Sequence, residues 1–296
     1  MPTRELSNSP SMLPLFARAG AAMIPGASLL PFVGGGGRDV PDTALRLSEV
    51  PIESDRLTAY DRVCGFDLRD DVPATYPHIL AFPLQLSLMT DPSFPFPAIG
   101  LVHIHNRIVQ HRRIRSSEQL RIDVWATPVE AHPRGKQFAL RTEVRVGEEL
   151  VWEEVSTNLK RGGGSEHATA PGADLPNAEE LPATATWSLP GDLGRRYGSV
   201  SGDLNPIHMH PVSAKLFGFK SAIAHGMWTQ ARCLAALEPR LPDAFTVEVA
   251  FKKPIFLPGK VEFCEADGPG AAFTVSFGVR DPRQGSSHLD GLAFSG

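Results

Sequence analysis

A carboxylate and an imidazole stand five residues apart in a short segment rich in turn-forming residues. They are Asp203 and His208, within the run SGDLNPIH at residues 201–208. Gly202 and Pro206 flank Asp203, which favours a fixed turn over a helix interior or a strand. A carboxylate beside an imidazole can hold a water molecule and move a proton at neutral pH, because histidine titrates there. The pair therefore indicates acid/base chemistry on water.

Two further residues complete the candidate site. Asn205 carries both a donor and an acceptor, and we expect it to orient the carboxylate or the water. Gly226 precedes an Ala/Leu-rich run, residues 227–237, that is typical of a largely buried helix ending at Glu238. The first amides of a helix carry a partial positive charge, and glycine lets a ligand approach the backbone closely. This pattern predicts a helix N-terminus that polarises a carbonyl oxygen.

Each of these residues also has a purely structural interpretation. Glycine, aspartate, asparagine and proline are the usual turn residues, so an isolated GDxNP indicates no more than a turn. The presence of His208 and of a downstream His-Gly pair favours chemistry. We interpret His225 as a structural residue that caps or packs at the helix entrance, and Ser201 as a local hydrogen-bonding residue.

Taken together, SGDLNPIH and the downstream AHGM at 224–227 resemble the signature of the (R)-specific enoyl-thioester hydratases, the MaoC-like branch of the hot-dog fold. The chain is similar in particular to the two-module actinobacterial 3-hydroxyacyl-thioester dehydratases. Segments YPH at 76–78, FPF at 94–96 and FKKP at 251–254 extend the likeness. The resemblance covers roughly residues 45–295.

The resemblance implies an α+β double hot-dog fold: two tandem hot-dog modules, each a long helix wrapped by a bent antiparallel sheet. It implies a hydro-lyase that reversibly dehydrates (R)-3-hydroxyacyl thioesters to trans-2-enoyl thioesters in fatty-acid or related lipid metabolism. By the same resemblance, Asp203 and His208 would be catalytic. Asn205 would orient them at the substrate, and the Gly226 N–H would hold the thioester oxygen.

Two other functions stay open. One is a non-catalytic subunit that binds or scaffolds acyl thioesters, although such a subunit needs no acid/base pair. The other is a hot-dog thioesterase, in which a carboxylate directs water at the carbonyl. The partner expected from the resemblance is an acyl-CoA or acyl-carrier-protein thioester, and a homodimer is left open.

No cofactor is expected, because the chemistry moves only water and a proton; coenzyme A or acyl carrier protein would be the carrier of the substrate. No metal site is expected either. The pairs His103/His105 and His208/His210 have the spacing of strand ligands but no plausible cysteine or carboxylate beside them.

Composition restricts the compartment and the partners. The net charge of −4 gives no basic field for nucleic acid or anionic membranes. Three cysteines without a CxxC motif indicate a reducing compartment, so we predict a cytoplasmic protein. The apolar stretch Met12–Val33 is interrupted by Arg18 and three prolines, so no membrane span is expected.

The 296 residues suit two modules of roughly 120–130 residues and a leader. We predict a leader at 1–44, an N-terminal module at 45–160, a linker at 161–185 and a C-terminal module with the active site at 186–296. Alternating, β-branched runs predict strands at 119–126, 137–146, 149–159, 245–251, 259–265, 271–279 and near 291–294.

The first module contains an imperfect copy of the motif. Residues 60–66 echo residues 197–203, but Phe66 stands where Asp203 does, and no histidine follows five residues later. We therefore predict that this module is catalytically inactive. The copy also predicts a buried helix at 80–89, in which a proline at position 83 is tolerated only in the first turn.

Overall fold

The structure is a computed structural model that describes residues 1–22 and 36–295. It contains two compact units, which interleave along the chain. Unit 1 comprises Met1–Ile52, Pro77–Ile104 and Ser117–Pro171, and unit 2 comprises Glu53–Tyr76, His105–Ser116 and Gly172–Gly296. Both units therefore draw on the first half of the chain. The module boundaries at residues 45, 160 and 185 remain predictions.

Unit 1 is built on a sheet in the order β1-β2-β4-β6-β7, with β5 paired to β6. The strands are β1 (Thr3–Leu6), β2 (Ala44–Val50), β4 (Leu120–Ala126), β5 (Glu130–His132), β6 (Gly135–Val146) and β7 (Glu149–Arg161). β1 pairs parallel to β2, and the other pairs are antiparallel. The three predicted strands of this unit are confirmed as β4, β6 and β7, whereas β1, β2 and β5 were not predicted. The leader contributes a strand and also the helix α1 (Met12–Ala21).

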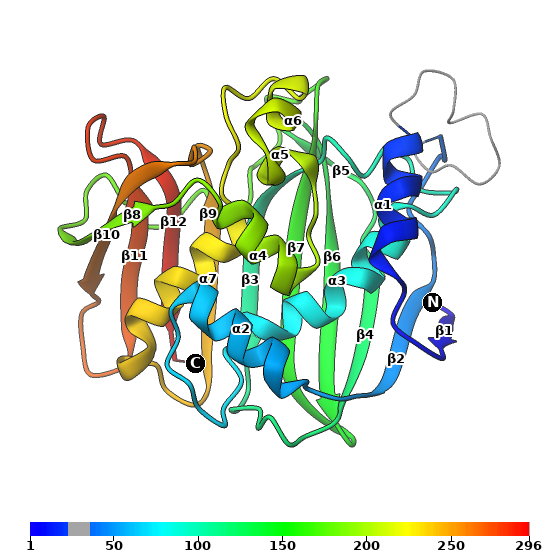
Figure 1. Cartoon of the computed structure of the whole chain (residues 1–296), viewed down its shortest axis with the longest axis horizontal. Helices are drawn as coiled ribbons and strands as arrows, with labels where there is room; N and C mark the ends of the chain where they lie inside the picture. The colour runs from blue at the N-terminus through cyan, green and yellow to red at the C-terminus, as the bar shows by residue number, and fades with distance from the viewer. Residues whose placement is uncertain (23–35, 296) are drawn as a thin grey trace. The chain divides into compact units, whose positions relative to one another are not determined.

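Helix α3 (Tyr76–Met89) covers one face of the unit 1 sheet (Figure 1). It begins before the predicted start at residue 80, and Pro83 lies in its interior, so the prediction for this proline was wrong. Interior proline costs a helix about 3 kcal/mol. Apart from Phe82 and Ser87, every residue of α3 is buried. Burial of the whole helix therefore offsets the lost backbone hydrogen bond.

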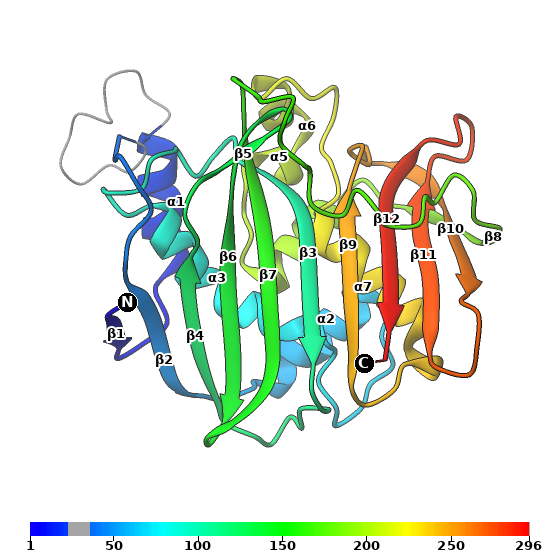
Figure 2. The same ribbon diagram turned by 180° about the vertical axis from the view of Figure 1, so that it is seen from behind.

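Unit 2 has a wholly antiparallel sheet in the order β3-β9-β12-β11-β10-β8. The strands are β3 (Val102–Gln110), β8 (Ala183–Leu189), β9 (Phe245–Phe251), β10 (Gly259–Asp267), β11 (Thr274–Arg280) and β12 (Ser287–Phe294). Residues 105–110 of β3 pair with β9. Figure 2 shows β9, β12 and β11 side by side, with α7 (Gly226–Leu237) behind them. Gln230 of α7 donates to Asn106 Oδ1 on β3 at 3.0 Å, which fixes the helix on the sheet.

The two copies of the repeated motif form matching helices within unit 2. Helix α2 (Ser54–Cys64) ends at Gly65, and α4 (Leu193–Ser201) ends at Gly202; both glycines are left-handed, with φ of 84° and 82°. The rings of Tyr60 and Tyr197 lie 6.1 Å apart between these helices. Two short helices, α5 (Pro206–Met209) and α6 (Pro211–Leu216), follow α4.

No helix in the described part of the chain is both long and apolar enough to cross a membrane. The segment Met12–Val33 falls partly outside the described residues: α1 accounts for its start, and residues 23–33 are not described. The described part of the segment is amphipathic rather than uniformly buried, since Leu15 and Ala19 of α1 are buried and Leu13 is exposed.

Candidate active site

Asp203 occupies a tight turn directly after α4. The left-handed Gly202 ends the helix, and the N–H of Asp203 donates to Ser201 Oγ at 3.1 Å. Its own Oδ1 accepts the N–H of Asn205 at 3.0 Å. Ser201 thus makes the local hydrogen bond expected of it. The carboxylate is held by backbone geometry, and its side chain is 27% exposed.

Asn205 connects the carboxylate to the histidine through its backbone. The N–H of Asn205 donates to Asp203 Oδ1, and its carbonyl oxygen accepts the N–H of His208 at 3.0 Å. Its side chain caps α5, accepting the N–H of Ile207 at 3.4 Å, and Pro206 takes the first helical position. We expected Asn205 to orient the carboxylate or the water; its backbone N–H contacts the carboxylate, and a role for its side chain toward water stays a prediction.

The ring of His208 is held in one tautomer. Its Nδ1 lies 2.8 Å from the carbonyl oxygen of Ile223. A carbonyl can only accept, so Nδ1 carries the proton and Nε2 carries the lone pair of the neutral ring. Burial lowers the pKa of His208, opposed by the nearby Asp203 carboxylate. His208 is therefore a neutral imidazole with a base nitrogen available at neutral pH.

Two glycines of α4 allow this loop to pack closely against the helix. A Cβ at Gly194 would lie 1.9 Å from the carbonyl oxygen of His208, and one at Gly198 would lie 3.0 Å from that of Asp203. Sequence reasoning missed both residues. The available signal was the pair of glycines four residues apart inside a helix, where each costs stability relative to alanine.

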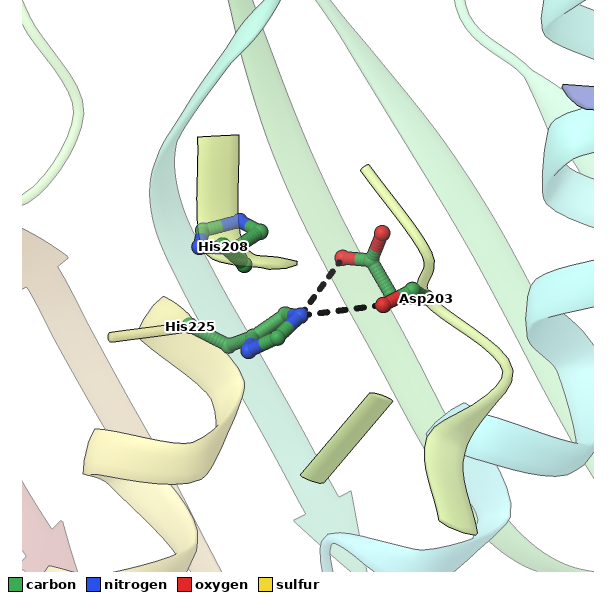
Figure 3. A group of neighbouring side chains, drawn as sticks. All are labelled: Asp203, His208 and His225. Atoms are coloured by element: carbon green, nitrogen blue, oxygen red, sulfur yellow. Dashed lines mark hydrogen bonds and ion pairs between the residues drawn. The ribbon is translucent and has the colours of Figure 1, made fainter. Parts of the chain in front are cut away.

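His225 belongs to the same cluster, which the sequence did not predict. Its ring is 3% exposed and stacks on the ring of His208, with centroids 3.7 Å apart and planes inclined by 25°. Its Nε2 lies 3.1 Å from the carbonyl oxygen of Asp203 and 3.7 Å from Oδ2 (Figure 3). The side chain makes no capping bond to α7. His225 is thus the N-cap residue of α7 by position, and of the two predicted roles, capping or packing, its side chain fills the second.

Gly226 begins α7, as predicted. The N–H of Thr229 bonds the carbonyl of His225 at 3.1 Å, so Gly226 lies in the first turn, whose amides have no partner within the helix. A Cβ at residue 226 would lie 3.0 Å from the Phe251 ring. Glycine therefore lets an aromatic side chain pack against the helix entrance, next to His225, which contacts both Asp203 and His208.

Metal binding can be considered from the donor atoms. Asp203, His208 and His225 each offer one ligand atom within 4.8 Å of the others, and no other group of three such residues occurs in the described chain. Each ring, however, already uses one nitrogen to donate to a carbonyl. The site is arranged for hydrogen bonding, and the expected absence of a metal and of a cofactor stays a prediction.

His103 and His105, one of the two histidine pairs predicted not to bind a metal, each contact a different residue. His103 Nε2 lies 3.0 Å from Ser156 Oγ, and His105 Nε2 lies 2.8 Å from Glu248 Oε1. These contacts belong to different units of the structure, because unit 1 ends its second segment at Ile104.

Comparisons with known proteins identify the family. A family model described as "MaoC like domain" matches residues 167–265. The chain is 36% identical over 255 residues to 3-hydroxyacyl-thioester dehydratase X of Mycobacterium tuberculosis, covering 84% of this chain and 88% of that protein. The crystal structure of HtdX of M. tuberculosis is similar with a TM-score of 0.74 and 36% identity, over 84% of this chain and 98% of that one.

A more distant solved structure agrees in fold. A conserved hypothetical protein of M. tuberculosis with a double hot-dog fold is 12% identical, with a TM-score of 0.55 over 87% of this chain and 94% of that one. The helix-covered antiparallel sheets of units 1 and 2 are thus those of the double hot-dog, as expected from the sequence. The chain belongs to the MaoC-like dehydratase family.

Proposed function

We propose that this chain catalyses the reversible dehydration of (R)-3-hydroxyacyl thioesters to trans-2-enoyl thioesters. The observation that carries the proposal is that a partly exposed carboxylate, Asp203, offers an oxygen within 4.8 Å of a ring nitrogen of His208, near the N-terminus of a buried helix. The related dehydratase of M. tuberculosis, whose name specifies 3-hydroxyacyl thioesters, supports the choice of substrate.

In the hydration direction, Asp203 and His208 hold one water molecule between them. As the water oxygen bonds to Cβ of the enoyl group, the pair takes a proton from the water and delivers it to Cα, which returns both groups to their starting state. An acid/base pair of this kind contributes about 10²–10⁴ in rate.

Negative charge develops on the thioester oxygen during this transfer. In this proposal the N–H of Gly226 donates to that oxygen, and the partial positive charge of the helix N-terminus adds to the effect; the position of Gly226 in the first turn of α7 supports this role. Loss of one such donor costs about 10²–10³ in rate. Glycine is required here for a second reason, since Phe251 packs where a side chain would stand.

The substrate is carried by coenzyme A or by acyl carrier protein, and no bound cofactor takes part in these steps. A cytoplasmic location follows as an inference from the cysteines: Cys64, Cys233 and Cys264 are all free and buried, as expected in a reducing compartment.

The proposal is tested by hydration of trans-2-enoyl-CoA substrates of short and long chain. The loss of absorbance of the conjugated thioester measures the reaction. We expect the wild type to form an (R)-3-hydroxy product, and Asp203→Asn and His208→Ala to lose at least about 10²-fold in kcat. A folded wild type inactive on both coenzyme A and carrier-protein substrates would refute the proposal in favour of a binding subunit. Release of free thiol without a 3-hydroxy product would indicate a thioesterase.

A further inference from the structure

We propose that His225 is a positioning residue of this site: it fixes the backbone of Asp203 by a hydrogen bond and supports the ring of His208 by stacking, without itself taking a proton. The inference rests on the proposed function and adds a third residue to it.

The first argument comes from the hydrogen bond. His225 Nε2 faces the Asp203 carbonyl oxygen at 3.1 Å, and because a carbonyl only accepts, this nitrogen must carry the proton. A Cβ on Gly198 would come within 3.0 Å of the same oxygen. The peptide of Asp203 is thus enclosed between α4 and the His225 ring, which sets the direction of the catalytic carboxylate.

The second argument comes from the unused nitrogen. His225 Nδ1 is among the buried side-chain atoms of the described chain that have no hydrogen-bond partner. An unsatisfied buried nitrogen costs free energy that a phenylalanine of similar shape would avoid. Packing alone would therefore be better served by phenylalanine, which indicates that the N–H of His225 has a use in the site.

The third argument concerns charge. The groups that face His225 are Asp203 in the turn, His208 on α5 and Tyr197 on α4, whose ring centroid lies 4.9 Å away. Burial, and next the neighbouring His208, lower the pKa of His225 to about 3, although Asp203 opposes the shift. A neutral ring at this place leaves His208 free to accept a proton without repulsion, and it shields one face of His208 from water.

Two substitutions separate the hydrogen bond from the stacking. His225→Phe keeps a ring over His208 but removes the donor to Asp203. We expect kcat to fall about ten- to hundredfold, as for a misplaced catalytic group, with KM and the acid limb of the pH profile little changed. His225→Gln keeps a donor and removes the ring. We expect a smaller loss of kcat and an acid limb displaced upward, because His208 becomes better solvated.

His78→Phe is the matched control, because His78 is a buried histidine at the start of α3 in unit 1. We expect it to lower the melting temperature but to leave kcat for a short-chain enoyl-CoA and its pH profile unchanged. Equal kcat and identical pH profiles for the wild type and both His225 variants would overturn the inference. So would an equal loss of kcat in all three variants, since that would indicate a general loss of stability.

Titration of the histidine ring protons by NMR provides a readout that does not depend on turnover. We expect His208 of the wild type to titrate below its ordinary pKa, and His208 of His225→Gln to titrate higher. An unchanged titration would contradict the stacking role. If the wild type hydrates no enoyl thioester while this shift is observed, the proposed function fails and the positioning of His208 by His225 stands.

Discussion

At the start of α3 in unit 1, His78 Nδ1 lies 2.7 Å from Glu154 Oε1, whereas at the start of α7 in unit 2 the ring of His225 stacks on that of His208. The other oxygen of Glu154 accepts from Gln85 Nε2 at 3.1 Å, and the Glu154 side chain is 0% exposed. Both oxygens of this carboxylate are thus engaged inside the core of unit 1.

Asp203 in unit 2 differs on both points. One of its oxygens accepts a backbone N–H, and its side chain is 27% exposed, so water can reach it. Both units contain an acid and a histidine beside a buried helix, but only in unit 2 does the acid remain accessible. The comparison teaches that accessibility, set by the turn after Gly202, distinguishes the proposed acid/base site from a buried hydrogen-bonded pair of the same residue types.

The connecting segments explain the difference. In unit 2, α5 and α6 lie between α4 and α7 and bring His208 to the Asp203 turn. Between α2 and α3 the chain is shorter, no helix intervenes in the described chain, and Phe66 is buried in the position that corresponds to Asp203. This is the structural basis for the prediction that the first copy of the motif is inactive.

Outside the proposed catalytic pair, the largest effect is expected from adding one methyl group to α4. In Gly194→Ala the new Cβ would lie 1.9 Å from the carbonyl oxygen of His208, so the loop must move. We expect kcat to fall about 10²-fold, because a shift of about 1 Å in a catalytic group costs that much. Steady-state hydration of a short-chain enoyl-CoA measures the loss.

Gly20→Ala is the matched control for that change, since Gly20 lies in helix α1 of unit 1 and a Cβ there meets nothing within 4 Å. We expect unchanged kcat and a slightly higher melting temperature, by the difference in helix propensity. Equal activity of Gly194→Ala and Gly20→Ala would show that contact with α4 does not position His208.

A change in the unit 1 pair should affect stability rather than catalysis. In Glu154→Gln an amide replaces the buried carboxyl group and disturbs its hydrogen bonds to His78 and Gln85, so we expect the free energy of unfolding to fall by about 1–3 kcal/mol. Urea denaturation measures it. Unchanged stability would contradict the interpretation of His78 and Glu154 as a structural pair.

The smallest effect is a displacement of the pH profile. His208 must be neutral to accept a proton, and burial lowers its pKa from the ordinary 6.5. Activity should therefore persist at pH 6.5 and be lost only as the pH falls through the lower pKa of the folded enzyme. The acid limb of kcat/KM for the free enzyme measures this pKa. An acid limb above 6.5 would mean that His208 is not the titrating base.

Local signals in the sequence predicted seven of the strands, α7 and the turn that holds Asp203, because alternation, apolar runs and turn residues depend on neighbours in the chain. The pairing of β1 with β2 could not be predicted, since it joins residues far apart in sequence. Pro83 lies in the interior of α3 because burial of the helix outweighs the low helix propensity of proline.

The candidate site was predicted in part for the same reason. Asp203, Asn205, His208 and Gly226 stand in a contiguous motif or at a helix start, so their types and spacing were informative. The stacking of His225 on His208 and the contact of Gly194 with the loop are tertiary. The glycine pair of α4 indicates close packing at that helix, but the sequence does not identify the segment that packs there.

We infer that Asp203, the accessible acid of unit 2, is catalytic and that Glu154, the buried acid of unit 1, is not. The most direct test measures kcat for hydration of one short-chain trans-2-enoyl-CoA by the wild type, Asp203→Asn and Glu154→Gln in the same assay. We predict a loss of about 10²–10⁴ for Asp203→Asn and wild-type turnover for Glu154→Gln. Turnover retained by Asp203→Asn and lost by Glu154→Gln would contradict the account.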